Sequence, residues 1–177
     1  MEHLSQERKI EKKPIRRTSK VQTLALIGIL AGAYAAITIA LGGISYGPIN
    51  LRLANLLIAV VPIVGWPGVI GVSLGVFLGN ISSPLGPIDL VSSLFTLIGL
   101  SVVKALSRRT VFGGLILYAI GLGAWVSFEL HLVLGLPYLP TLYFVISGIA
   151  LVVVGLAYPL YRALQSSGLV RRFNNAE

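Results

Sequence analysis

A carboxylate at the head of a row of hydroxyl groups is the first feature of this sequence that could do chemistry. Ser92, Ser93 and Thr96 follow Asp89 by three, four and seven residues, a spacing that puts all of them on one face of a helix. Ser and Thr in apolar helices can instead bond to the backbone carbonyl four residues back. A charge inside an apolar span costs about 2.5–3.5 kcal/mol and usually faces a cavity or a partner. The carboxylate therefore favours a polar pocket along this face.

A second carboxylate lies beside an aromatic ring. Glu129 follows Trp125 by four residues, so an indole and a carboxylate are one helical turn apart. Trp125 could instead anchor the helix at a membrane surface, and Tyr46 and Tyr138 could either close over a ligand or serve as such anchors. His131 is a lone histidine in this part of the chain, and no set of suitable ligands for a metal ion is apparent near it. We therefore expect no metal site and no cofactor.

The basic residues indicate which elements must position these groups. Seven of the 14 Lys and Arg residues lie in the first twenty positions, and six of the others form two blocks, namely Lys104, Arg108 and Arg109, and Arg162, Arg171 and Arg172. The chain is 55% hydrophobic and 11% charged, whereas a soluble domain has about 25% charged residues. This pattern is typical of a polytopic membrane protein with its basic residues on the cytoplasmic side.

Counting spans between the basic blocks predicts six transmembrane helices with both termini in the cytoplasm. Residues 21–43 fit one span, because a span needs about 20 apolar residues. Residues 53–103 must hold an odd number, and their length makes it three, the first two of them short. Residues 110–161 hold two more. Pro and Gly clusters predict the turns between these helices at residues 65–68, 82–87 and 135–137.

The predicted protein is an all-α integral protein of the cytoplasmic membrane. A basic cytoplasmic tail (1–20), expected to be disordered, precedes a six-helix membrane domain (21–165) and a second cytoplasmic tail (166–177). Contact with the bilayer and its anionic headgroups accounts for the net charge of +8, so no nucleic acid is expected. The sequence has no phosphate loop, no hydrolase motif and no cysteine. We therefore expect neither an enzyme nor ATP hydrolysis in this chain.

The topology gives each polar residue a depth in the membrane. Six polar residues from four helices fall near the outer surface: Arg52, Asn55, Asn80, Asp89, Glu129 and His131. Chance would place some of them toward the cytoplasm. We expect an outward-facing binding pocket, although the three charged residues among them could instead lie singly in the headgroup layer.

The first helix has a different character, because small residues recur along it. Ala31 and Ala35, Gly32 and Ala36, and Ala36 and Ala40 are each four positions apart. Such pairs let another helix approach closely. The partner is more commonly a helix of the same chain, and a separate subunit is the alternative.

Three blocks of the sequence carry a resemblance to a known family. The first runs from Ser45 to Leu57 with Pro62 after it, the second from Gly79 to Leu97, and the third comprises residues 125–130, 136–137 and 143–148. Together they resemble the QueT family of queuosine-precursor transporters, which are substrate-binding S components of energy-coupling factor (ECF) transporters. The resemblance covers the chain from about Val21 to Leu164.

The resemblance implies partners and a substrate. An S component works with a transmembrane T component and two cytoplasmic ATPases, and small residues of its first helix contact the T component, here Ala31 and Ala35. The substrate would be a 7-deazaguanine, such as the aminomethyl or cyano precursor of queuosine, or a related base. Asp89 or Glu129 would accept N–H groups from its guanine-like edge.

The other residues of the predicted pocket fit such a ligand. Asn55 and Asn80 would serve the ring nitrogens or the carbonyl, and Trp125 or Tyr46 would stack on the flat base. Arg52, Ser93 and Thr96 complete the candidate substrate-binding set.

The chain departs from the family pattern at two positions. Asn55 stands where the family has Glu, and Ile149 stands after Gly148 where the family tends to have Glu. The loss of two carboxylates lowers the attraction for a cationic aminomethyl group. A neutral deazaguanine or another base therefore stays open as the ligand.

Two other function classes remain at this point. A stand-alone carrier could couple transport to protons through Asp89 or Glu129. A membrane enzyme or structural subunit is the third class, and no catalytic constellation in the sequence supports it.

Overall fold

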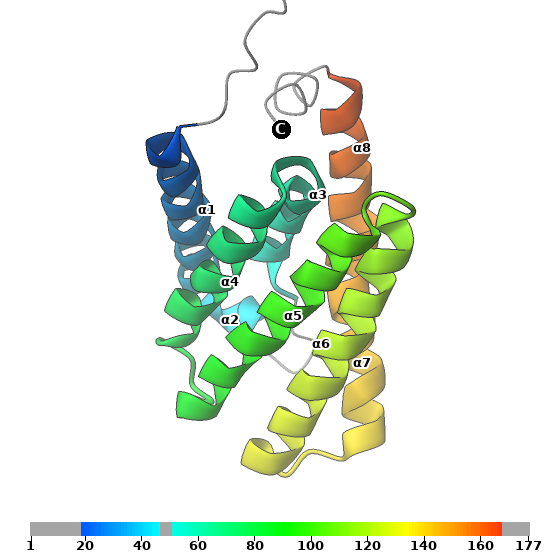
Figure 1. The fold of residues 1–177 in the computed structure, drawn as a ribbon. Helices are drawn as coiled ribbons and strands as arrows, with labels where there is room; N and C mark the ends of the chain where they lie inside the picture. The colour runs from blue at the N-terminus through cyan, green and yellow to red at the C-terminus, as the bar shows by residue number, and fades with distance from the viewer. Residues whose placement is uncertain (1–18, 47–50, 168–177) are drawn as a thin grey trace, which may run out of the picture.

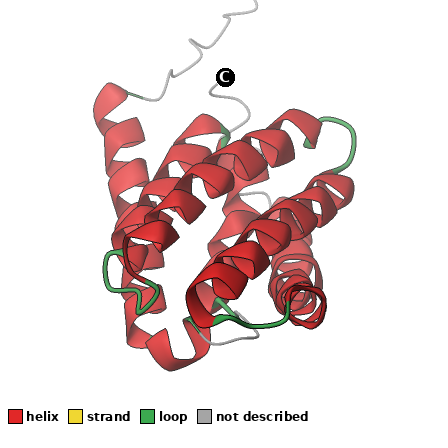
Figure 2. Cartoon of the chain, turned by 90° about the horizontal axis from the view of Figure 1, so that it is seen from below, coloured by secondary structure: helices red, strands yellow, loops and turns green. Residues whose placement is uncertain are grey.

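The structure, a computed structural model, describes residues 19–46 and 51–167. These residues are almost entirely helical and contain no strand, as Figures 1 and 2 show. The tails expected at residues 1–20 and 166–177 lie almost wholly outside the described residues, so the division into domains stays a prediction.

The first half of the described chain forms three helical stretches. α1 (Lys20–Ala40) is followed by the one-turn α2 (Gly42–Ser45). A 3-10 helix, η1 (Leu53–Val60), continues directly into α3 (Val61–Val64), and α4 (Trp66–Asn80) comes next.

The second half forms three longer stretches. The 3-10 helix η2 (Gly86–Leu90) leads into α5 (Val91–Leu106), and α6 (Val111–Leu134) follows. The last stretch runs from α7 (Tyr138–Ala150) through the π-helical η3 (Leu151–Ala157) into α8 (Tyr158–Ser166).

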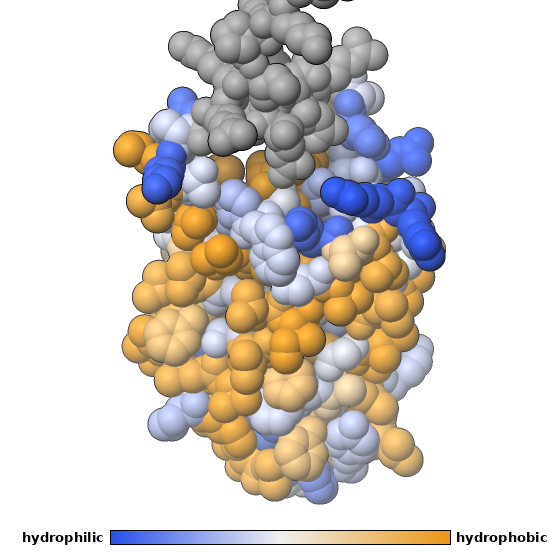
Figure 3. All heavy atoms as spheres, in the orientation of Figure 1, coloured by the Kyte–Doolittle hydropathy of each residue, from blue (hydrophilic) through white to orange (hydrophobic). Residues whose placement is uncertain are grey.

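Four of these stretches are long and apolar enough to cross a membrane: Lys20–Ala40, Gly86–Leu106, Val111–Leu134 and Tyr138–Ser166. Leu53–Val64 and Trp66–Asn80 are apolar but shorter. Large apolar side chains such as Val21, Leu139 and Tyr143 are exposed, and apolar surface covers the middle of the molecule in Figure 3. The prediction of a helical membrane protein is confirmed, and the shorter helices are the second and third, as predicted.

Three glycines at predicted turns have backbone angles that favour glycine: Gly86, at the start of η2 with φ 78°, and two glycines that lie directly between helices. Gly65, between α3 and α4, has φ 68°, and Gly135, between α6 and α7, has φ 66°. Both values lie in the left-handed region, where a side chain adds strain. These residues end one helix and redirect the chain into the next. The third predicted turn, at residues 82–87, overlaps the connection between α4 and η2.

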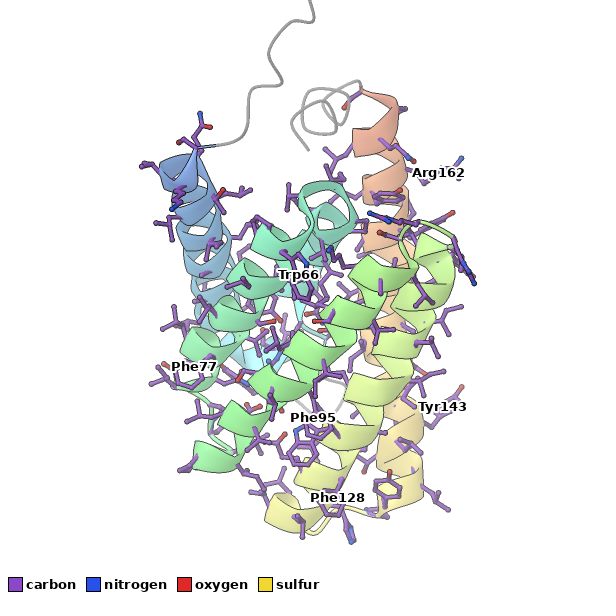
Figure 4. The ribbon with its side chains drawn as sticks, in the orientation of Figure 1. Trp66, Phe77, Phe95, Phe128, Tyr143 and Arg162 are labelled. Atoms are coloured by element: carbon purple, nitrogen blue, oxygen red, sulfur yellow. The ribbon has the colours of Figure 1, made fainter. Side chains whose placement is uncertain are left out.

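Basic residues gather at one end of the bundle. α1 begins, α8 ends and the loop between α5 and α6 lies at this end, shown at the top of Figure 1. Hydrophilic surface covers the same end in Figure 3, and Figure 4 places Arg162 there. Lys104 holds this end of α5 against the start of α4, because its Nζ lies 4.5 Å from the centre of the Trp66 ring.

α1 packs against α4 at backbone distance. A Cβ added at Gly75 would lie 2.6 Å from the Cβ of Tyr34 and 2.9 Å from the carbonyl oxygen of Ala31. At Gly71 an added Cβ would lie 2.9 Å from the Cβ of Leu30. Any larger residue at these two positions would therefore push the helices apart. The close approach holds Tyr34 inside the bundle, where it is 1% exposed.

Ala31 and Ala35 lie on a face of α1 that packs within the chain. Both are buried, at 6% and 8% exposure, whereas Gly32 and Ala36 on the same helix are exposed. A contact of Ala31 and Ala35 with a T component stays a prediction. Their small size serves the other use predicted for such pairs, which is close packing within the chain.

Candidate functional site

A buried carboxylate at the start of the fourth helical stretch is the centre of the candidate site. Asp89 lies in η2 and is 1% exposed. Asn80, at the end of α4, donates from Nδ2 to Asp89 Oδ1 at 2.8 Å and to the Asp89 carbonyl oxygen at 2.7 Å. The five residues between α4 and η2 form the turn that brings the amide to the carboxylate. Asn80 therefore fixes both the side chain and the backbone of Asp89.

The guanidinium of Arg52 pairs with the same carboxylate from a third element. Arg52 directly precedes η1, and its Nη2 lies 3.3 Å from Asp89 Oδ2. Its Nε donates to the carbonyl oxygen of Ser45 at 3.5 Å, and its Cζ lies 5.4 Å from the centre of the Tyr46 ring. A buried ion pair is tolerated when further hydrogen bonds satisfy the charges. Asn80 and the Ser45 carbonyl supply such bonds here.

Tyr46 closes this cluster on the side of α2. Its hydroxyl donates to the carbonyl oxygen of Gly79, next to Asn80 on α4. The ring is half-buried. One edge of Tyr46 is thus tied to the end of α4 while a face of its ring is turned to Arg52.

These groups border a small cavity. Four polar residues line it, namely Ser45, Tyr46, Arg52 and Asp89, and three apolar residues complete the lining, namely Leu85, Val126 and Leu130. Its volume is about 10 Å³, which gives room for about one water molecule. The combination of an apolar wall with a few convergent polar groups is typical of a small-molecule site.

A second buried carboxylate lies between α5 and α6. Ser92 donates from Oγ to Glu129 Oε2 at 3.0 Å and accepts from Trp125 Nε1 at 2.9 Å. Trp125 stacks on Phe95, with ring centres 4.2 Å apart and planes 12° apart; Figure 4 shows Phe95 on α5 beside α6. Among the described residues, no group bonds to the buried Glu129 Oε1. This oxygen remains available as an acceptor.

The structure separates some predicted site residues from these clusters. Asn55 is buried in η1, where its Oδ1 accepts from Tyr34 at 2.7 Å and so ties η1 to α1. Ser93 donates to the carbonyl oxygen of Leu90 at 2.6 Å, which is the backbone use predicted as its alternative. Thr96 is fully buried, and its Oγ1 has no partner in the described part of the chain.

His131 lies outside the site. It is exposed near the end of α6, with Nδ1 2.6 Å from the Leu136 carbonyl oxygen and its ring at an edge contact with Tyr138. Across residues 19–46 and 51–167, no group of three His, Cys, Asp or Glu side chains is placed to hold a metal ion.

Sequence analysis did not select several residues that form the site. Ser45 contributes a backbone carbonyl, which no side-chain pattern reveals. Val126 and Leu130 line the cavity, and a signal for them existed, because they share a helix face near Glu129 at a spacing of four. Phe95 has no such signal, since its stack on Trp125 depends on the register between two helices.

Comparison with known proteins gives one match. The family model described as QueT transporter matches residues 24–166, which is most of the chain. No curated protein and no solved structure matches it.

Proposed function

The chain belongs to the QueT transporter family, and we propose that it is the substrate-binding S component of an ECF transporter for a queuosine precursor or related 7-deazaguanine. In this proposal the protein crosses the cytoplasmic membrane six times and takes its substrate from the outer side. It performs no chemistry itself. The observation that carries the proposal is the buried Asp89, fixed by Asn80 beside a small cavity.

The charge distribution supports the topology. In the proposed topology the four long helical stretches and the two shorter apolar ones each cross the membrane once. The described basic residues other than Arg52 lie at the start of α1, in α8, or at the end of α5 and the loop that follows it, and these meet at one end of the bundle, which we assign to the cytoplasm. Asp89 precedes α5, and Glu129 lies near the end of α6, so both carboxylates fall toward the opposite end.

The chemistry of the site supports a guanine-like ligand. A base of this type presents a ring N–H and an exocyclic amino group side by side, and a carboxylate accepts such a pair in the plane of the ring. Asp89 is a fixed acceptor of this kind, and Glu129 Oε1 offers a further acceptor. Tyr46 supplies a ring face next to Asp89, and Trp125 supplies an indole near Glu129.

The energy for transport would come from partners. The sequence contains no phosphate loop, so we assign ATP hydrolysis to two cytoplasmic ATPases coupled through a transmembrane T component. In this proposal α1 contacts the T component, and Ala31 and Ala35 are the small residues expected there.

Ligand binding by the purified protein tests the proposal. Thermal shift and calorimetry in detergent would compare 7-deazaguanines with purines lacking the 2-amino group. At a ligand concentration one hundred times Kd, binding should stabilise the protein by about 2.7 kcal/mol. Failure of every deazaguanine and guanine to bind would reject the proposed substrate class.

A stand-alone proton-coupled carrier is the second candidate. The observation that favours it is Glu129, a buried carboxyl with one oxygen unpartnered in the described chain, because such groups in membrane spans often carry protons. Uptake into proteoliposomes containing this chain alone, driven by a proton gradient, would support the carrier. Uptake that requires the T component, the ATPases and ATP would support the S component.

A further inference from the structure

The cavity beside Asp89 is too small for the proposed substrate. Its volume of about 10 Å³ gives room for about one water molecule, whereas a deazaguanine has two fused rings. At least one group that lines the cavity must therefore move for a base to reach Asp89.

Three of the four polar residues at the cavity, Tyr46, Arg52 and Asp89, have side chains that are held to different degrees. Two hydrogen bonds of 2.7 and 2.8 Å from Asn80 fix Asp89, and the hydroxyl of Tyr46 is bonded to the Gly79 carbonyl. The described contacts of Arg52 are longer, at 3.3 Å to Asp89 and 3.5 Å to the Ser45 carbonyl. Good N–H···O bonds are about 2.7–3.2 Å long. Arg52 also has the longest and most flexible side chain of the three, so it is the group most easily moved.

The contacts of Arg52 are those that a guanine-type base would make. The 2-amino-6-oxo edge of such a base contains a planar guanidine unit, formed by the carbon that carries the amino group and its three nitrogens. Arg52 presents a planar guanidinium to Asp89 Oδ2 and lies near the ring of Tyr46. A carboxylate accepts either planar set of N–H donors, and an aromatic face stacks with either plane.

We propose that Arg52 is a placeholder for the substrate. Its guanidinium pairs with Asp89 and lies near the ring of Tyr46 until the guanidine edge of the base displaces it. This inference rests on the proposed function for its choice of ligand. The displaced guanidinium keeps its contact with the Ser45 carbonyl while its Nη2 end turns away from Asp89.

The exchange makes Arg52 a specificity-determining residue. A base with the 2-amino group offers Asp89 a pair of N–H donors in place of the single N–H of Arg52, whereas a base without it offers only its ring N–H and gains no donor over Arg52. The need to displace Arg52 also raises the apparent Kd of every ligand, because that Kd equals the intrinsic Kd divided by the fraction of time that Asp89 is free. Removing Arg52 should therefore tighten binding.

Arg52→Gln is the main test, with Arg162→Gln as the matched control at an exposed arginine of the opposite end. Calorimetry would measure the Kd of 7-cyano-7-deazaguanine for each variant and for wild type, after thermal unfolding has shown that each is folded. If Arg52 covers Asp89 for about nine-tenths of the time, its loss tightens binding about tenfold. The control should match wild type.

A second readout keeps the test independent of the base. Arg52→Ala should leave a position that methylguanidinium fills, with a saturable rise in Tm that an equal concentration of methylammonium does not give. Wild type should show no such rise, and 7-cyano-7-deazaguanine should compete with methylguanidinium in the variant. Arg52→Lys replaces the planar fork by a single ammonium and should bind the base more tightly than wild type.

Weaker or unchanged binding of the base to folded Arg52→Gln and Arg52→Lys would overturn the inference. Weaker binding would mean that Arg52 contacts the bound base, and unchanged binding would mean that the ion pair does not compete. If no base binds even to wild type, the proposed function fails, while the methylguanidinium measurement still decides whether Arg52 occupies a site for a planar N–H donor.

Discussion

The two buried carboxylates, Asp89 and Glu129, come from neighbouring helical stretches but have different surroundings. Asp89 receives two hydrogen bonds from Asn80 and pairs with Arg52. Glu129 receives one hydroxyl, from Ser92, and its second oxygen has no partner in the described chain. The first is a fixed acceptor integrated into the fold, and the second is an acceptor left open. We infer that Asp89 positions the ligand, whereas Glu129 determines how strongly the site favours a ligand with a positive charge.

Loss of the Asp89 carboxylate should have the largest effect. Asp89→Ala leaves Arg52 as an unpaired buried charge, which costs about 3–5 kcal/mol, so the variant should unfold at much lower temperature and bind no base. Asp89→Asn keeps the shape and isolates the charge. This variant should lose two charge-assisted hydrogen bonds to the base, of about 1.5 kcal/mol each, and its affinity should therefore fall about a hundredfold. Calorimetry on folded Asp89→Asn checks this, and wild-type affinity would remove Asp89 from the site.

Glu129→Gln should affect binding more than folding. The amide oxygen can still accept from Ser92, so the Tm should stay close to that of wild type. Loss of one charge-assisted acceptor should weaken binding about tenfold, and the loss should be larger for the aminomethyl base than for the cyano base, since only the former is a cation. Calorimetry with both ligands gives the comparison. A collapse of Tm like that of Asp89→Ala would show that Glu129 is a structural carboxylate instead.

Asn80→Ala should release Asp89 without removing it. The carboxylate loses the donor that fixes its orientation, so it becomes more like Glu129. We expect binding to weaken about fivefold, which corresponds to about 1 kcal/mol, together with a lower Tm. If Kd and Tm both equal those of wild type, the two hydrogen bonds do not orient Asp89.

Trp125→Phe should have the smallest effect. Phenylalanine keeps an aromatic ring for the stack on Phe95 but cannot donate to Ser92, so the contact of Ser92 with Glu129 should loosen. Because Trp125 acts on the ligand only through Ser92 and Glu129, this change should alter Kd by about twofold, which is within the range of a single neutral hydrogen bond. A loss larger than that of Glu129→Gln would place the indole in direct contact with the ligand.

Most of the fold could be predicted from the sequence, because bilayer thickness and the basic blocks limit where helices begin and end. The turn at Gly65 and the one at Gly135 lie where Pro and Gly clusters predict them. The π-helical segment Leu151–Ala157 has no sequence signal in an otherwise uniform apolar run. The number of crossings and the side on which the termini lie remain part of the proposal.

The site could be predicted only to the level of its helix ends. The predicted outer ends of four helices group the polar residues, and three of them, Arg52, Asn80 and Asp89, do contact one another in the structure. Their part in substrate binding stays a prediction. Which groups bond to one another depends on helix rotation and register, which a single sequence does not specify. For the same reason the sequence predicts neither the hydrogen bond from Tyr34 to Asn55 nor the close approach of Ala31 to α4.

The most direct test of the central claim is the affinity of the wild-type protein for two ligands that differ only in the 2-amino group. The pair is 7-cyano-7-deazaguanine and its analogue without that group, measured by calorimetry under one set of conditions. If Asp89 reads the guanidine edge, the analogue should bind at least about a hundredfold more weakly, because it leaves a buried acceptor without its donor. Equal affinity for the two ligands would contradict the assignment of Asp89 as the group that recognises the base.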